Sequence, residues 1–363
     1  MSTGEQKVVF KSPTSDDATG RAIERIWAAD GPAAWALTPL SWLFGLGTAT
    51  RNLLFDLGLL HSHALGLPAI SVGNLSVGGT GKTPVSAWIA GELVKLGARP
   101  AILLRGYGED ESLVHAQLNP GVPVIANPDR VAGASEAIRQ GATVLVLDDA
   151  FQHRRARRIV DLVLIAAEQR EAHRLLPAGP LRESRGALRR AHLVVITRKS
   201  ASLADADVAA AAWSGFAGAP RTAVIALRPR ELVPAGAGNG PRTPIPLGDL
   251  TGKRVLAISA IGAPAAFEDQ LVSYGAVLES AAFPDHHRFS PADVAALALR
   301  AQGTDLAVCT LKDAVKLGPL WPRQAAGLWY LSQSVEVERG AALLHEVLLR
   351  LLPAGHVEQV EHE

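Results

Sequence analysis

Residues 71–84 read Ser-Val-Gly-Asn-Leu-Ser-Val-Gly-Gly-Thr-Gly-Lys-Thr-Pro and form the most informative segment of this chain. An apolar run at residues 67–72 precedes the glycines and predicts a buried strand. Residues 85–96 follow with apolar side chains at helical spacing. A strand, a glycine-rich loop and a helix in this order are typical of a phosphate-binding loop, whose backbone amides and helix N-terminus surround a phosphate group.

The residues of this loop that are predicted to bind a nucleotide are Gly78, Gly79, Thr80, Gly81, Lys82 and Thr83. Lys82 is expected to reach the β- and γ-phosphates, and the Thr83 hydroxyl is expected to bind Mg²⁺. The first glycine of the usual motif is replaced by Ser76. A glycine-rich turn without a ligand is the alternative, but a lysine and a threonine follow the last glycine in the required order, which favours a nucleotide site.

Composition sets the broad class of the protein. A chain of 363 residues with 48% hydrophobic content is expected to form two domains. The net charge of +1 gives no signal for nucleic acid as a partner. The single cysteine, Cys309, excludes a disulfide framework and fits a reducing compartment. Residues 1–20 are mostly polar, are expected to be disordered, and lack the apolar core of a signal peptide.

Residues 21–60 contain an uncharged segment at positions 33–50. Three tryptophans at helical spacing share one side of a predicted helix: Trp27, Trp35 and Trp42. The segment is marginal for a spanning helix, which needs about 20 apolar residues, and Pro39 is expected to break it. Tryptophan favours the headgroup region of a bilayer, so helices lying in the membrane interface are one interpretation. A buried helix pair packed on the first domain is the other.

Apolar runs alternate with helical patterns through residues 61–216. The runs lie at residues 101–104, 122–126, 143–147, 162–166 and 193–197. This alternation predicts an α/β domain whose mainly parallel sheet carries helices on both faces. Prolines and glycines crowd residues 217–250 and predict a linker or extended hairpin that acts as a hinge. A smaller α/β domain is expected over residues 251–352, followed by a polar tail at 353–363.

Charged residues follow two of the predicted strands. Asp148 and Asp149 end the run at 143–147, which is where P-loop enzymes place a carboxylate for Mg²⁺. Either aspartate alone would also serve as a helix N-cap, but the upstream loop favours a metal role for at least one. Arg105 follows the run at 101–104, where it would contact a phosphate or lie in a turn at the surface.

A second polar cluster, Asp285-His286-His287, lies in the predicted smaller domain. Adjacent side chains of an extended chain point to opposite faces, so these two histidines are not expected to share a metal ion. One histidine paired with a carboxylate for proton transfer is the better interpretation.

Six motifs of this sequence, taken together, match those of one known protein family. They are Val72-Gly-Asn-Leu-Ser-Val-Gly-Gly-Thr-Gly-Lys-Thr-Pro84, Arg105-Gly-Tyr-Gly108, Asp148-Asp-Ala-Phe-Gln-His153, Leu176-Pro-Ala-Gly-Pro-Leu-Arg-Glu183, Phe283-Pro-Asp-His-His287 and Leu311-Lys-Asp-Ala-Val-Lys316. Over nearly its whole length the chain resembles the tetraacyldisaccharide 4′-kinase family, in which a serine at position 76 is normal. It departs from that family at Ala150 and Leu311, where glycine and glutamate are usual, and in a shorter segment after Gly108.

The resemblance implies a P-loop kinase fold joined to a smaller α/β domain by the hinge. It implies that ATP and Mg²⁺ are bound and that the γ-phosphate is transferred to the 4′-hydroxyl of a tetraacyl-disaccharide 1-phosphate, a step of lipid A biosynthesis. The partners implied are this glycolipid and the cytosolic face of the inner membrane, with no nucleic acid. The expected location is therefore the cytoplasm, in peripheral association with that membrane.

The resemblance also assigns roles to individual residues. Asp110 aligns with the catalytic aspartate of the family, which accepts the proton of the sugar hydroxyl, and His286 is expected to orient it from across a cleft between the domains. The neighbours Glu109 and Glu111 compete with Asp110 for this role because the alignment is shifted easily in the shortened segment. Contacts to the substrate are expected from Asn74, Arg105, Gln152, His153 and Arg182.

A phosphate-binding loop also occurs in proteins with two other functions, a GTPase switch and an ATP-gated membrane adaptor. A GTPase switch would need a lysine one place earlier than in Thr310-Leu-Lys-Asp313, and a glycine where Phe151 stands. A nonenzymatic, ATP-gated membrane adaptor would explain the tryptophans but would leave Asp110 and His286 without a role. An assay with a glycolipid acceptor separates these alternatives from a kinase.

Overall fold

The computed structural model describes residues 27, 31–106, 109–169, 173–215, 218, 220–236, 238–239 and 242–353. The chain divides into two compact units. The larger unit comprises Ala29–Arg228 and Ser334–Glu363, and the smaller unit comprises Met1–Ala28 and Pro229–Gln333. Residues 1–20, predicted to be disordered, and all of the predicted tail beyond residue 353 lie outside the described residues.

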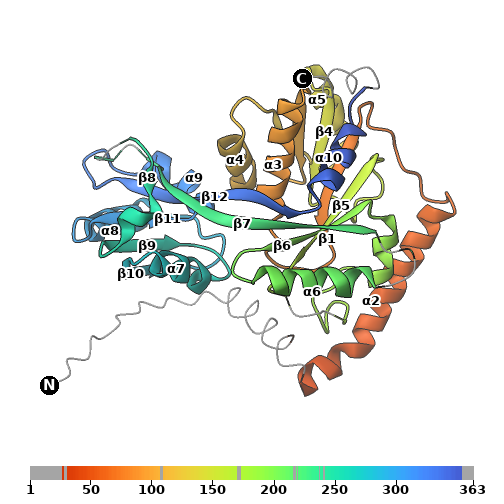
Figure 1. The fold of residues 1–363 in the computed structure, drawn as a ribbon, viewed down its shortest axis with the longest axis horizontal. Helices are drawn as coiled ribbons and strands as arrows, with labels where there is room; N and C mark the ends of the chain where they lie inside the picture. The colour runs from red at the N-terminus through yellow and green to blue at the C-terminus, as the bar shows by residue number, and fades with distance from the viewer. Residues whose placement is uncertain are drawn as a thin grey trace. The chain divides into compact units, whose positions relative to one another are not determined.

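The larger unit is built on a parallel sheet (Figure 1). Its strands are β1 (Ala69–Asn74), β2 (Pro100–Leu104), β3 (Val124–Ala126), β4 (Val144–Asp148), β5 (Val160–Ala166), β6 (Leu193–Arg198) and the first part of β7 (Arg221–Pro234). Their order is β7-β6-β5-β1-β4-β2-β3, and each neighbouring pair is parallel. The five strands β1, β2, β4, β5 and β6 are wholly buried, as expected for a sheet covered on both sides.

Helices cover both faces of this sheet. On one face α3 (Lys82–Lys95) and α10 (Ala341–Leu349) pack their apolar side chains on residues such as Val72 and Val146. On the other face α5 (Arg130–Arg139) and α6 (Leu203–Ser214) cover the alternate residues, including Leu147 and Ile196. The helix α4 (Glu109–Leu118) contacts α3 and β3, and the 3-10 helix η1 spans Arg185–Arg190. The predicted α/β class is confirmed.

The smaller unit has a second parallel sheet with the order β10-β9-β11-β12. These strands span Val277–Ala282, Arg254–Ser259, Leu306–Cys309 and the first part of Leu328–Arg339, respectively. The short strand β8 (Ile245–Pro246) pairs antiparallel with β7. The helices are α7 (Pro264–Ser273), α8 (Pro291–Ala301) and α9 (Leu311–Leu317), with 3-10 turns η2 (Leu247–Leu250) and η3 (Gly318–Leu320).

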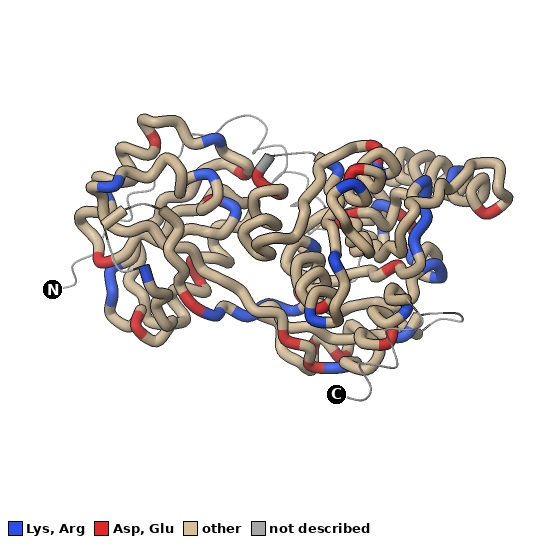
Figure 2. The backbone as a smooth tube through the Cα atoms, turned by 90° about the horizontal axis from the view of Figure 1, so that it is seen from above, with Lys and Arg blue, Asp and Glu red and all other residues tan. Residues whose placement is uncertain are grey.

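The helix α2 (Pro32–Asp56) lies at the N-terminal end of the larger unit. The Ser41 hydroxyl donates a hydrogen bond to the carbonyl of residue 175 and accepts one from the amide of residue 178, both in a later loop. Asn52 donates a hydrogen bond to the buried Glu183 carboxylate at 2.6 Å. The side of α2 that carries two tryptophans is exposed: Trp35 is 62% and Trp42 71% exposed. None of the described helices is both long and apolar enough to cross a bilayer. Elsewhere, charges of both signs are dispersed along the chain (Figure 2).

Three expectations need correction. The helix α2 continues through Pro39 instead of breaking there, because the proline removes only one backbone donor and its side of the helix is open to water. Residues 221–226 are no linker, since they pair with β6 as a strand whose residues 223–227 are buried. The second half of β12 and α10 belong to the larger unit and not to the smaller one, because leucines of α10 complete the core beside α3.

Candidate active site

The glycine-rich loop connects β1 to α3. Gly78 and Gly81 have φ angles of 124° and 81°, which glycine adopts without strain. A Cβ atom on Gly81 would lie 2.4 Å from Leu227 Cδ1, so a larger residue there would force the Leu227 side chain to move. Because α3 begins at Lys82, the unpaired amides of its first turn lie at the end of this loop. The loop is therefore shaped as an anion-binding site.

Residues of other segments hold the loop in place. Asn74 donates a hydrogen bond to Thr80 Oγ1 at 3.1 Å, and Thr197 at the end of β6 donates to the Thr80 carbonyl at 2.8 Å. Lys199 Nζ donates to the Gly79 carbonyl at 3.1 Å. The conformation of the loop is thus fixed by two buried hydrogen bonds at Thr80 and one exposed hydrogen bond at Gly79.

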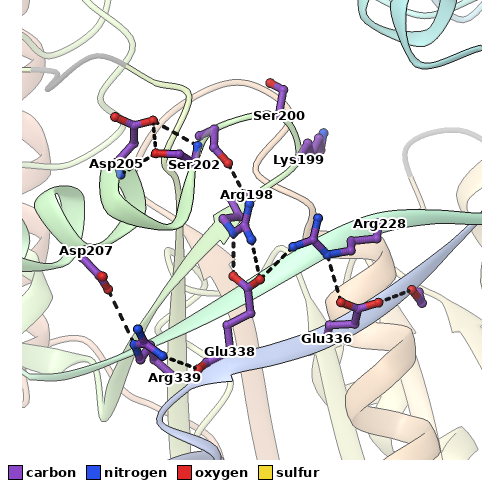
Figure 3. Close-up of polar contacts among 12 residues, drawn as sticks. Arg198, Lys199, Ser200, Ser202, Asp205, Asp207, Arg228, Glu336, Glu338 and Arg339 are labelled. Carbon is purple, nitrogen blue, oxygen red and sulfur yellow. Dashed lines mark hydrogen bonds and ion pairs between the residues drawn. The ribbon is translucent and has the colours of Figure 1, made fainter. Parts of the chain in front are cut away.

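The end of β6 is itself anchored by an ion cluster (Figure 3). Arg198 makes a two-point ion pair with Glu338 of β12. Arg228 of β7 bonds both Glu338 and Glu336 at 2.9 Å. Since Arg198 stands between Thr197 and Lys199, this cluster supports the two side chains that bind the loop.

Charged groups converge beside the loop. Lys82 Nζ lies 3.8 Å from Asp149 Oδ1, and Arg182 Nη1 lies 3.0 and 3.1 Å from the two Asp149 oxygens. Burial lowers the pKa of Lys82, and the charge of Asp149 opposes that shift. Asp149 has a φ angle of 47°, a left-handed conformation that is uncommon outside glycine and that often marks functional sites.

The carboxylate of Asp148 is only 5% exposed and is held by three donors. His115 Nε2 lies 2.9 Å from its Oδ2, while the Ser86 hydroxyl and the Asp149 amide bind its Oδ1 at 2.9 and 3.0 Å. Burial acts to raise the pKa of Asp148, but the hydrogen bonds of His115 and Ser86 and the charge of Lys82 outweigh it and lower that pKa. Asp148 is therefore an anion at neutral pH.

A cavity of about 690 Å³ lies in the larger unit at the ends of β2 and β4. Its described lining includes five basic residues: Arg51, Lys82, Arg105, Arg130 and Arg182. It includes three acidic residues: Glu111, Asp148 and Asp149. Burial lowers the pKa of Arg130 to about 10, which still leaves this side chain charged at neutral pH. The excess of basic groups suits a ligand with several phosphates.

Most of the predicted site residues meet at this cavity. Its lining includes Lys82, Thr83, Arg105, Asp148, Asp149, Gln152, His153 and Arg182. Asn74 is fully buried and supports Thr80 instead of lining the cavity. Asp110 is 8% exposed at the start of α4, and it is Glu111 that belongs to the lining. His286 lies in the smaller unit, where its φ angle is 57°.

The sequence interpretation missed several residues of the site. His115 and Ser86 bind Asp148, and Arg130 donates to the Asp148 carbonyl at 3.1 Å. From α2, Phe44 and Thr48 join the cavity lining. His115 follows Glu111 by four residues, so helical spacing alone would have placed it on the same face of α4.

The donors present fit a nucleotide with Mg²⁺. One hydroxyl, Thr83, and two carboxylates, Asp148 and Asp149, are the kind of ligands that Mg²⁺ takes when phosphates and water complete its shell. No group of three or more His, Cys, Asp or Glu among the described residues is arranged to hold a metal by itself. Fold and site together define a P-loop phosphotransferase that binds a nucleoside triphosphate.

Comparison with known proteins identifies the family. A sequence model of the family described as tetraacyldisaccharide-1-P 4′-kinase, LpxK, matches residues 33–352. The tetraacyldisaccharide 4′-kinase of Anaeromyxobacter sp. (strain Fw109-5) is 39% identical over 344 residues, covering 82% of this chain and 88% of that protein. The one from Halorhodospira halophila (strain DSM 244 / SL1) is 36% identical, covering 89% and 94%.

A solved structure agrees. The crystal structure of LpxK from Aquifex aeolicus in complex with ATP matches with a TM-score of 0.71 and 29% identity, over 88% of this chain and 99% of that one. The chain belongs to the tetraacyldisaccharide-1-P 4′-kinase family. It is an ATP-dependent kinase that acts at the 4′-kinase step of lipid A biosynthesis.

Proposed function

We propose that the cavity of the larger unit is where ATP, Mg²⁺ and the 4′-hydroxyl of a tetraacyl-disaccharide 1-phosphate react. The observation that carries this proposal is the convergence of Lys82, Thr83 and the two aspartates with Arg105 and Arg182 on one cavity. The loop amides and Lys82 bind the β- and γ-phosphates, and the arginines bind phosphate oxygens of the nucleotide or the substrate.

Thr83, Asp148 and Asp149 are the proposed holders of Mg²⁺. When bound, the cation neutralises the charge of the phosphates. In the structure, Arg182 and Lys82 both pair with Asp149. When the nucleotide binds, these two cations would interact with the phosphates as well as with the aspartate. Their positions keep the γ-phosphate oriented for in-line attack.

Proton transfer is assigned to the start of α4. Asp110 accepts the proton of the 4′-hydroxyl as its oxygen attacks the γ-phosphorus; the bond to the β-phosphate breaks and ADP leaves. For His286 we propose the role that the resemblance implies, which is to orient this base. Gln152 and His153 of the cavity lining are proposed to contact the sugar headgroup. Burial and nearby arginines lower the pKa of His153, so it binds as a neutral group.

We also propose that α2 lies on the cytosolic surface of the inner membrane. Its exposed Trp35, Trp42 and Leu46 form an apolar side, while Phe44 and Thr48 reach the cavity. A glycolipid whose acyl chains remain in the bilayer would then present its headgroup directly to the site.

The test is transfer of the γ-phosphate from ATP to the purified glycolipid. Lys82→Ala should remove most of the turnover, because the developing charge on the phosphoryl group loses its main cation. Lys95→Ala is the matched control, since Lys95 lies at the far end of the same helix and pairs only with Glu92 among its described contacts. Near-native transfer by Lys82→Ala would reject the assignment of this cavity.

A further inference from the structure

His115 is a buried histidine whose ring contacts Asp148 of the candidate active site. Its side chain is fully buried, and Nε2 lies 2.9 Å from Asp148 Oδ2. A carboxylate only accepts hydrogen bonds, so Nε2 carries the hydrogen. Nδ1 is also buried and has no hydrogen-bond partner among the described residues. Burial of an imidazole with one nitrogen unpaired costs free energy, which makes a purely structural purpose a poor explanation.

The helix that carries His115 also carries the acidic pair of the site. Asp110 and Glu111 lie in the first turn of α4, and His115 follows Glu111 by four residues. Residues at this spacing share one face of a helix. The face of α4 that holds Asp148 is therefore the face from which Glu111 reaches the cavity.

We propose that His115 is a positioning residue, which fixes the orientation of the Asp148 carboxylate and, through α4, its distance from the Asp110–Glu111 pair. The inference rests on the proposed function, in which Asp148 holds Mg²⁺. Ser86 binds the other oxygen of the same carboxylate, so the plane of the group is set from α3 and α4 together. Outer contacts of this kind orient metal-binding side chains and change metal affinity or activity by about 10–100-fold when they are removed.

The test is calorimetric binding of ADP, measured once with MgCl₂ and once with EDTA, so that turnover is not the readout. The wild type should bind ADP more tightly with Mg²⁺. In His115→Phe, which keeps a ring but no hydrogen bond, the gain from Mg²⁺ should fall by about 10–100-fold. ADP affinity in EDTA should be unchanged. Because both values come from the same variant, a general loss of stability leaves their ratio unaffected.

Two further variants make the test specific. The amide nitrogen of glutamine occupies nearly the place of Nε2, so His115→Gln should restore most of the Mg²⁺ effect, whereas the shorter His115→Asn should not. Asn119→Leu removes a different contact of the α4 segment, the 2.9 Å hydrogen bond to the Ala87 carbonyl of α3, and should leave the ratio as in the wild type.

The outcomes separate the two proposals. If the wild type shows no Mg²⁺-dependent gain, the proposed metal site is wrong. If the wild type shows the gain and His115→Phe retains it in full, the positioning role of His115 is overturned. The same holds if Asn119→Leu lowers the gain as much as His115→Phe does, because His115 would then only hold α4 in place.

Discussion

At the scale of the residue, Asp110 and Glu111 compete for the role of general base. The structure buries Asp110 at the start of α4 and places Glu111 on the cavity lining. We expect Asp110→Ala to lower kcat by about 10²–10⁴-fold with unchanged ADP affinity, as for a lost general base, and Glu111→Ala to lower it less. Steady-state kinetics with both substrates decide this. If Glu111→Ala is the inactive variant, the alignment of the shortened segment is off by one residue.

Residues fixed by a local motif were predictable, and residues fixed by folding were not. Lys82 and Thr83 follow from the order of the loop, and Asp148 from its place at the end of an apolar run. Asn74 was predicted to touch substrate, but its side chain is buried against Thr80, because the loop needs an internal donor. His115 lies 33 positions from Asp148, and a contact at that separation depends on how α4 packs.

At the scale of the element, α2 allows a test of membrane association. Replacing the exposed Trp35 and Trp42 by serine should shift the protein from vesicles to the soluble fraction and raise KM for vesicle-borne substrate. Turnover on a dispersed short-chain analogue should be kept. Val208→Ser, at a 70% exposed apolar residue of α6, is the control and should change neither quantity. Unchanged vesicle binding by the tryptophan variant would show that this side of α2 has another purpose.

Elements with a clear apolar pattern were predicted and the others were missed. The runs before and after the loop became β1, β2, β4, β5, β6 and α3, as expected. The strand β7 was overlooked because Pro229 and Pro234 dominate the local pattern, although residues 223–227 are apolar and buried and the strand pairs with β6. Proline likewise suggested a break in α2 that the helix does not have.

At the scale of the whole molecule, Glu338 joins residues that are far apart in the chain. It binds Arg198 of β6 and Arg228 of β7, and its side chain is only 16% exposed. We expect Glu338→Gln to lower the free energy of unfolding by about 1–3 kcal/mol, between the values for surface and buried ion pairs. Glu336→Gln, at a side chain that is 51% exposed, should cost less. Urea denaturation of the three proteins measures this.

The Glu338 carboxylate should also make the free energy of unfolding depend on pH. The hydrogen bond from Arg198 lowers the pKa of Glu338 in the folded protein. A lowered pKa stabilises the fold above the pKa of the unfolded chain, and this contribution is lost as the pH falls through the folded value. The stability difference between wild type and Glu338→Gln should therefore be full at pH 7 and shrink below about pH 4.3, the ordinary pKa of glutamate. A difference that grows on acidification would contradict this role.

A crystal structure with a non-hydrolysable ATP analogue and Mg²⁺ tests the proposed phosphate and metal sites most directly. We expect the β- and γ-phosphates on the amides of residues 78–83, with Lys82 beside them. We expect the cation between Thr83 and the pair Asp148 and Asp149, and Arg182 turned from Asp149 toward a phosphate. Phosphates bound outside this loop, or a cation held without any of these three residues, would contradict the proposed sites.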